Sequence, residues 1–298
     1  MILVLKIYGK VSKELSGESD DEDVQNERQR ILGQPQGLLD STVLIKELTK
    51  IYFKYPVILA VKNIPVTIQR GECFGLLGFN GAGKTTTFKI LTGEETVTSG
   101  DVFIEHFSIT KSLQKVKSRV GYCPQSDALL EYMTGREIMI MCARLWGVSE
   151  PQIQLYVNRW LSSVQLEPHA DKLIRTDSGG TKRRLSTAIA LMGKTSVTLL
   201  DEPSTGMDPV AQHLLWDAVT QTCESGKAII ITSHRMEGCD AFCTRLAIMV
   251  QGKFLCLGSP QHLKNKFGNI YILKVKVKID AQEDKRDPLK YFITLTFP

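Results

Sequence analysis

The sequence lacks any uninterrupted apolar run of the ~18–20 residues that a helix needs to cross a bilayer. Its short apolar opening, residues 1–5, is also well below the length of a signal-peptide core. These absences predict that the chain is soluble as given and that any role at a membrane depends on a partner.

Cysteine pairs with the spacing of a redox or metal motif are missing as well. The seven cysteines are odd in number, and no two of them have Cys-x-x-Cys spacing. This distribution is typical of reduced, partly buried thiols in a cytosolic protein.

The charge balance points to no particular partner. A formal net charge of +5 over 298 residues suits a protein near an anionic membrane and equally a protein with no charged partner. Aromatic residues make up only 7% of the chain and are not interleaved with a basic stripe. We therefore expect no nucleic-acid partner.

Length and composition favour one large folded domain with an appendage. The chain is 43% hydrophobic and 23% charged, as in ordinary globular proteins. Residues 1–40 carry an acidic block at 18–23 and little apolar periodicity, which predicts a flexible acidic linker. We expect the folded domain at 41–268, and the alternating pattern of 269–298 predicts the truncated start of a second module.

The apolar runs predict an α/β fold with a mainly parallel sheet. Short β-rich runs alternate with helical segments, as expected for a buried parallel sheet with helices on both faces. Two further runs, 43–48 and 66–68, predict a curved antiparallel sheet. A helical subdomain is expected at about 126–192, with a capping box at Thr134 and Glu137 and Pro151 in a first helical turn. The runs expected in the parallel sheet are 73–77, 120–123, 197–200, 228–232 and 246–250.

A glycine-rich loop between a predicted strand and a predicted helix fits the pattern of a phosphate loop. Glycines allow consecutive backbone N–H groups to turn toward phosphate oxygens. Lys84 is placed to reach the β- and γ-phosphates, and the Thr85 hydroxyl is placed to hold Mg²⁺. The loop consists of Gly78, Phe79, Asn80, Gly81, Ala82, Gly83, Lys84 and Thr85.

Two acids end the apolar run at 197–200. Asp201 and Glu202 lie where a strand of an α/β fold delivers its ligands. We expect Asp201 to hold Mg²⁺ through water and Glu202 to polarise the attacking water. The alternative is that both acids simply cap the next turn.

A second glycine motif opens a basic helix. Ser178, Gly179 and Gly180 precede Thr181 and the basic residues 182–184, and together they would form an anion site at a helix N-terminus. The motif is common in loops, but its position before Asp201 favours a role in phosphate chemistry. Four single residues complete the pattern, although each alone is more often structural: Tyr52, Gln125, Asp208 and His234.

In this order and spacing, these motifs make the chain resemble the nucleotide-binding domain of an ATP-binding cassette (ABC) transporter. The resemblance extends from about Val43 to Phe267. The residues at 71–78 and 200–209 resemble those of the A subfamily of lipid exporters, and in particular those of the second of their two cassettes. It implies a P-loop NTPase of the ABC type.

The resemblance assigns a role to each matching residue. Tyr52 would stack on adenine, with Tyr55 as a nearby rival, and Gln125 would sense the γ-phosphate and help to hold Mg²⁺. Glu202 would be the general base and His234 the γ-phosphate switch. The residues implied in binding phosphate, with Mg²⁺ at Thr85 and Asp201, are Gly78, Asn80, Gly81, Ala82, Gly83, Lys84, Thr85 and Thr86 in this chain, together with Ser178, Gly179, Gly180 and Asp208.

Three residues depart from the pattern of the family. Asp177 stands before the Ser-Gly-Gly motif where a neutral residue is usual, and a carboxylate near a triphosphate is unfavourable. Thr181 replaces an amide-bearing residue, and Arg235 replaces a small one. The first two put in question the composite site formed with a partner.

The sequence therefore predicts a Mg-dependent ATPase that powers lipid transport. Its implied partners are a second cassette, in a head-to-tail ATP sandwich, and the transmembrane domains of a lipid exporter at the cytoplasmic face of a membrane. One alternative is a fragment, or the product of a decayed gene, that binds ATP without hydrolysing it and has a regulatory role or none. Another is a soluble cassette ATPase in translation or DNA maintenance, but the chain lacks the second cassette or coiled coil that such proteins usually carry.

Overall fold

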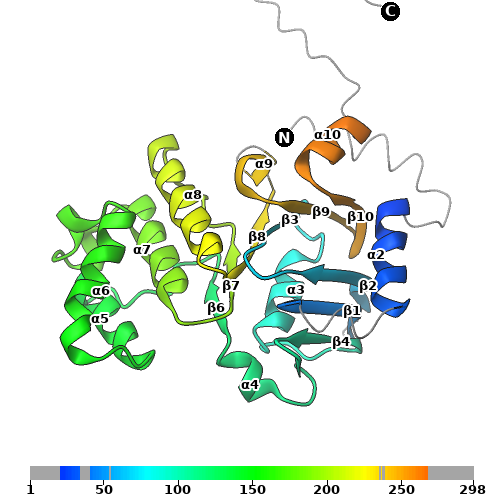
Figure 1. Cartoon of the computed structure of the whole chain (residues 1–298), viewed down its shortest axis with the longest axis horizontal. Coiled ribbons are helices and arrows are strands. Elements are labelled where there is room, and N and C mark those ends of the chain that lie inside the picture. The colour runs from blue at the N-terminus through cyan, green and yellow to red at the C-terminus, as the bar shows by residue number, and fades with distance from the viewer. Residues whose placement is uncertain (1–20, 34–40, 54, 235, 237–238, 268–298) are drawn as a thin grey trace, which may run out of the picture. The chain divides into compact units, whose positions relative to one another are not determined.

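Two β-sheets organise the residues that the computed structural model describes, which are 21–33, 41–53, 55–234, 236 and 239–267 (Figure 1). The larger sheet has six strands in the order β10-β9-β3-β8-β7-β6. The strands β9, β3, β8, β7 and β6 run parallel to their neighbours, and only β10 pairs antiparallel with β9. The six strands are β3 (Cys73–Leu77), β6 (Val120–Cys123), β7 (Val197–Asp201), β8 (Ala228–Ser233), β9 (Arg245–Val250) and β10 (Lys253–Gly258).

The larger sheet is buried on both faces, which explains the continuous apolar runs of its strands. All five residues of β3 and of β7 are buried. A strand covered on both faces gains from an apolar side chain at every position, so its sequence does not alternate. The prediction of a mainly parallel sheet is confirmed.

The smaller sheet is antiparallel, with the order β2-β1-β4-β5. Its strands are β1 (Val43–Tyr52), β2 (Ile58–Ile68), β4 (Ser99–Ile104) and β5 (Phe107–Ser108). The helix α3 (Lys84–Leu91) follows β3, and α4 (Leu113–Lys117) follows β5. One core cluster joins this sheet to α3 and the neighbouring strands, with Phe88 fully buried within it.

A helical segment separates β6 from β7 in the chain. It contains α5 (Gly135–Leu145), α6 (Glu150–Ser163) and α7 (Gly179–Met192), with short 3₁₀ turns at Glu167–His169 and Ile174–Thr176. The predicted capping box is present: the Glu137 N–H donates to Thr134 Oγ1 over 3.2 Å, and the Thr134 N–H donates to Glu137 Oε2 over 2.8 Å. Pro151 lies in the first turn of α6, as expected.

The remaining helices lie after β7. They are α8 (Pro209–Glu224), α9 (Cys239–Phe242) and α10 (Pro260–Phe267). Within the described ranges, every helix is too short or too polar to serve as a membrane span. Six of the seven cysteines are buried, and all seven are free thiols.

The predicted flexible linker over 1–40 is wrong for one segment, because Glu22–Gly33 forms the helix α2. Val24 and Ile31, seven residues apart, are each 2% exposed, and the helix contacts β2 and β10 (Figure 1). Its acidic start is paired with distant bases: Lys266 Nζ lies 2.9 Å from an Asp21 carboxylate oxygen and 2.7 Å from Asp23 Oδ2. Residues 1–20, 34–40 and 269–298 lie outside the described residues, and so does the predicted C-terminal module.

Candidate functional site

A cavity of about 620 Å³ lies where the phosphate loop meets the tip of the antiparallel sheet. Its polar lining comes from segments that are far apart in the sequence, which the ends of β3, β6 and β7 bring together. Ligands of open parallel sheets bind at these carboxyl ends. The lining residues are Tyr52, Ile58, Leu59, Ala60, Lys62, Phe79, Asn80, Gly81, Ala82, Gly83, Lys84, Thr85, Thr86, Gln125, Glu202 and Gln251.

The loop at 78–83 depends on glycine for its path. Gly83 caps α3 with φ 106°, in the left-handed region that favours glycine. A Cβ at Gly83 would lie 2.5 Å from the Ala60 carbonyl oxygen, and one at Gly78 would lie 2.5 Å from the Met249 carbonyl oxygen. At Gly78 and Gly83 the loop is therefore held too close to β9 and β2 for a side chain.

The start of α3 presents backbone donors to the cavity. The first N–H groups of a helix have no intrahelical acceptor, and no side chain among the described residues caps this helix. The N-terminal end of a helix also carries partial positive charge. Phosphate oxygens are the ligands that such an end binds best.

Lys84 crosses beneath the loop. Its Nζ donates to the carbonyl oxygens of Gly78 (2.8 Å) and Phe79 (3.2 Å) and lies 3.9 Å from Glu202 Oε1. Burial lowers the pKa of Lys84, and the nearby carboxylates of Glu202 and Asp201 oppose that shift. The ammonium group is thus positioned by backbone carbonyls beside two acids.

Only one of the two carboxylate oxygens of Asp201 accepts a hydrogen bond from the described residues. Its Oδ1 accepts a hydrogen bond from the Thr232 hydroxyl, while Oδ2 is buried with no hydrogen-bond donor among the described residues. Burial raises the pKa of Asp201, and the charge of Glu202 raises it further. A buried, unpartnered carboxylate oxygen beside a second acid fits a divalent cation, which would supply the missing charge.

Glu202 is held in an unusual backbone conformation. Its φ is 48°, and its N–H donates to Thr232 Oγ1 over 2.9 Å. Non-glycine residues at positive φ are uncommon and cluster at functional sites. The Glu202 carboxylate lies 3.1 Å from His234 Nδ1 and 3.4 Å from Thr205 Oγ1. The histidine side chain is 39% exposed, so it can contact both Glu202 and a ligand.

Arg183 organises this region and was read from the sequence only as part of a basic helix start. Its guanidinium donates to the carbonyl oxygens of Pro124 and Asp201 and lies 3.0 Å from Asp127 Oδ1. The residue is 3% exposed. It thereby ties the chain on both sides of Gln125 to the end of β7. Its place in the first turns of a helix that opens with basic residues was the available signal.

The Ser-Gly-Gly motif does not line the cavity. Ser178 caps α7, where its Oγ accepts a hydrogen bond from the Thr181 N–H over 3.2 Å and lies 2.9 Å from Thr181 Oγ1. Thr181 is 4% exposed. A Cβ at Gly180 would lie 3.4 Å from the Gly206 carbonyl oxygen, which is an ordinary van der Waals distance. Gly179 opens the helix beside it.

The Asp177 carboxylate, next to the Ser-Gly-Gly motif, is buried. Its side chain is only 3% exposed, and its Oδ1 lies 3.4 Å from His169 Nδ1. Burial beside His169 leaves little of this carboxylate accessible to a ligand at the Ser-Gly-Gly motif. Arg235, the third departure from the family pattern, lies outside the described residues.

Three further predicted residues are placed as follows. Asp208 caps α8 by accepting a hydrogen bond from the Ala211 N–H over 3.0 Å, and this bond lowers the pKa of its carboxyl. It does not line the cavity. Tyr52 does line it, with Lys50 Nζ 5.0 Å from its ring centre, whereas Tyr55 is fully exposed and does not.

Several lining residues were not expected from the sequence. Ile58 and Leu59 are exposed apolar residues at the start of β2, and Phe79 is the one bulky side chain in the loop. Lys62 and Gln251 come from β2 and from the turn between β9 and β10. Only the pairing of these segments in three dimensions shows that they face the loop.

Comparison with known proteins gives a consistent result. The family model described as "ABC transporter" matches residues 61–205. The mouse phospholipid-transporting ATPase ABCA3 is 59% identical over 280 residues, which is 94% of this chain and 16% of that protein. The mouse retinal-specific phospholipid-transporting ATPase ABCA4 is 48% identical over 283 residues, which is 94% of this chain and 12% of that protein.

Solved structures share the fold. A structure described as the ATP binding subunit of an ABC transporter has a TM-score of 0.70 at 24% identity and covers 76% of this chain and 94% of that one. The chain spans only 12–16% of the length of the curated relatives named above.

Proposed function

The chain belongs to the A subfamily of ABC transporters as a nucleotide-binding domain, and from that premise we propose that it binds and hydrolyses Mg·ATP to power phospholipid transport. The observation that carries the proposal is the meeting of Lys84 and Glu202 in one cavity, beside the unpartnered Asp201 oxygen. Phosphoryl transfer needs a cation that binds the phosphates, a base that activates water and a carboxylate that binds the metal ion.

Binding of the nucleotide is assigned to the loop and the start of α3. Backbone N–H groups of Gly81, Gly83 and the following turn would hold the phosphates, with Lys84 as their charge partner. Tyr52, which lines the same cavity, would stack on the adenine ring, supported by the apolar surface of Ile58 and Leu59. The cavity volume of about 620 Å³ lies within the range of small-molecule sites.

Mg²⁺ would be held by Thr85, Gln125 and Asp201, directly or through water, and it would neutralise charge on the β- and γ-phosphates. Asp201 supports this assignment through its buried, unpartnered oxygen. Gln125 is suited because Arg183 fixes the segment that carries it.

Hydrolysis is assigned to Glu202 and His234. The Glu202 carboxylate would accept a proton from water as the water oxygen bonds to the γ-phosphorus and the bond to the ADP oxygen breaks. Its backbone is fixed by Thr232, and its carboxylate is oriented by His234. Lys84 would stabilise the negative charge that develops on the transferred group.

A partner cassette is needed to complete the site. Ser178, Gly179 and Gly180 lie outside the cavity, so within one chain they do not face the phosphate loop. We propose that they close over the γ-phosphate bound to a second cassette, in a head-to-tail pair with two such sites. Asp208 would support the opposite edge of this composite site by fixing the start of α8.

The transported substrate is proposed from the names of the relatives. The two mouse proteins compared above are named phospholipid-transporting ATPases. The transmembrane domains that would move the lipid, and the position of this domain at the cytoplasmic face of a membrane, belong to the same proposal.

The first test compares ATP hydrolysis by the purified chain with that by Glu202→Gln over a series of protein concentrations. We expect turnover that rises faster than linearly with concentration and falls by about 10²–10⁴-fold in the variant, while nucleotide binding is retained. Undiminished turnover in the variant would overturn the role of Glu202. Binding without turnover in the natural chain would favour the alternative of a non-hydrolysing fragment.

A further inference from the structure

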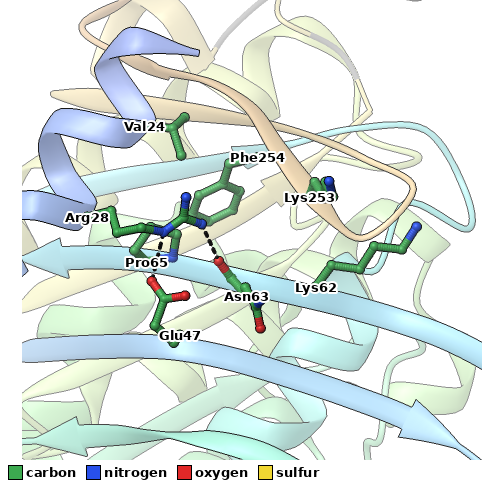
Figure 2. A pocket seen from close by; sticks show the side chains of 8 residues that line it. All are labelled: Val24, Arg28, Glu47, Lys62, Asn63, Pro65, Lys253 and Phe254. Atoms are coloured by element: carbon green, nitrogen blue, oxygen red, sulfur yellow. Dashed lines mark hydrogen bonds and ion pairs between the residues drawn. The ribbon is translucent and has the colours of Figure 1, made fainter. Parts of the chain in front are cut away.

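A second pocket, of about 340 Å³, lies between α2, the antiparallel sheet and the turn that joins β9 to β10 (Figure 2). It exists because α2 packs on β2 and β10. Its size is at the lower end of the range of small-molecule sites. The lining residues are Val24, Arg28, Glu47, Lys62, Asn63, Pro65, Lys253 and Phe254.

The pocket carries an excess of positive charge. Arg28 reaches from α2 to Glu47, with Nε and Oε1 2.9 Å apart, and donates to the Asn63 carbonyl oxygen over 2.9 Å (Figure 2). This pairing neutralises the one acid of the lining. For the Lys62 and Lys253 ammonium groups, the described part of the chain offers no hydrogen-bond or ion-pair partner. Two uncompensated cations therefore face one pocket.

One wall of the pocket is apolar and buried. Val24 is 2% exposed and Phe254 is 5% exposed, and Pro65 is buried beside them. Charged side chains next to a buried aromatic ring suit a ligand with an anionic group and a compact carbon part. Lysine binds phosphate as a point charge, and it does so most strongly when a second cation shares the anion.

We propose that this pocket is a second anion site, which binds the phosphate monoester group of a small organic phosphate between Lys62 and Lys253. The apolar wall formed by Val24, Pro65 and Phe254 would contact the carbon part of the ligand. A soluble phosphomonoester and the headgroup of phosphatidic acid both offer this chemistry.

The second site adjoins the nucleotide cavity. Lys62 lines both cavities, and the turn after β9 places Gln251 in the nucleotide cavity and Lys253 in the second pocket. The wall between them is tied together by backbone hydrogen bonds from Lys62 N–H to the Gly252 oxygen (2.8 Å) and from Gly252 N–H to the Ala82 oxygen (2.9 Å). The two cavities therefore share part of one wall, so we expect a ligand in one to affect binding in the other, and any such coupling is reciprocal.

The test measures binding of two probes to the full chain with its nucleotide cavity saturated by a non-hydrolysable Mg·ATP analogue. One arm titrates glycerol 3-phosphate by calorimetry. The other measures co-sedimentation with phosphatidylcholine vesicles with and without phosphatidic acid. The variant is Lys253→Glu, which lines only the second pocket, and its matched control is Lys194→Glu, an exposed lysine near the end of α7.

We expect Lys253→Glu to weaken binding of the phosphate probe by about tenfold or more, because a cation is replaced by an anion next to the ligand. Lys194→Glu should bind as the natural chain does. Binding of glycerol 3-phosphate would identify a soluble ligand, and binding of the acidic vesicles alone would identify a headgroup. Absence of binding in both arms, or equal binding by the two variants, would overturn the proposal. Nucleotide affinity and melting temperature, measured on both variants, establish that each is folded.

Discussion

Two helix starts in this domain are built on glycine-rich segments, but they are finished in different ways. At α3 the N-cap is Gly83, and none of the described side chains satisfies the first N–H groups. At α7 the N-cap is Ser178, and its hydroxyl already accepts the Thr181 N–H. The first is open to a ligand, and the second is closed by its own side chain.

The charged side chains around the N-termini of α3 and α7 differ as well. Lys84 and Glu202 line one cavity at the start of α3, and the buried Asp201 carboxylate lies close enough to act electrostatically on Lys84. At the start of α7 the nearest acid, Asp177, is buried against His169 instead. This difference supports the proposal that one chain binds the nucleotide at the start of α3, while its Ser-Gly-Gly motif acts at the site of a second chain.

Replacing the cation at the first helix start should have the largest effect. We expect Lys84→Ala to lower nucleotide affinity by about 10²-fold or more, because charge-assisted contacts to the phosphates are lost. Lys182→Ala is the matched control, since Lys182 lies in the first turn of α7 and pairs with Glu131. Titration with a fluorescent ATP analogue checks both variants. Equal losses in the two would remove the distinction between the helix starts.

A change at Asp201 should separate metal binding from folding. Mg²⁺ should raise the nucleotide affinity of the natural chain. We expect this gain to be about 10–100-fold smaller in Asp201→Asn, because the variant loses a carboxylate that supports the metal ion. The variant should melt no lower than the natural chain without ligand, because burial already disfavours the charge of Asp201 and Glu202 adds repulsion. Paired thermal melts and Mg²⁺ titrations test this. A large loss of stability would show that the carboxylate is structural.

The helix α2 should affect stability without touching either helix start. Burial raises the pKa of Glu27, but hydrogen bonds from Thr67 and the charge of Arg245 outweigh it, so the net pKa is lowered. The stabilisation is complete above the unfolded value of about 4.3 and is lost as pH falls through the lower folded value. We expect Glu27→Gln to cost about 1–3 kcal/mol at neutral pH and much less below pH ~3.

Denaturant unfolding of the natural chain and of Glu27→Gln, at neutral pH and in acid, provides the measurement. Nucleotide affinity serves as the internal control, because Glu27 lies outside the cavity. A difference in stability that does not depend on pH would contradict the assigned cause.

The smallest effect on folding is expected at Ser178. Ser178→Ala removes the cap of α7 and should cost about 1 kcal/mol of stability. Ser178→Asp keeps a capping oxygen, so its melting temperature should stay near that of the natural chain, but it places a negative charge at the helix start. We expect it to lose concentration-dependent turnover while its single-chain nucleotide affinity is unchanged. Normal turnover in Ser178→Asp would show that Ser178 only caps α7 and has no role in ATP hydrolysis.

Much of the site could be predicted from sequence because its parts are local. A strand, a glycine turn and a helix place Lys84 and Thr85, and a buried strand ending in two acids places Asp201 and Glu202. The expected gathering of Gln125 with these residues also follows from the order of parallel strands. Their placement is as predicted, whereas their roles stay predictions.

The missed features depend on contacts across long sequence separations. The acidic start of α2 reads as a solvated linker because its partners, His262 and Lys266, lie more than 230 residues further along the chain. The direction of Asp177 is set by His169, and the reach of Arg183 is set by Pro124 and Asp201. The pattern and spacing of residues predict a helix or a strand, but they do not predict which other helix or strand packs against it.

The most direct test of the account mixes two inactive variants. Lys84→Ala lacks a working first helix start and Ser178→Asp lacks a working second one. In a head-to-tail pair of the two, one site combines the intact halves. Because about half of randomly mixed pairs are of this kind and each holds one of two sites, the account predicts recovery of up to about a quarter of natural turnover. An inactive mixture, at concentrations where the natural chain hydrolyses ATP, would contradict it.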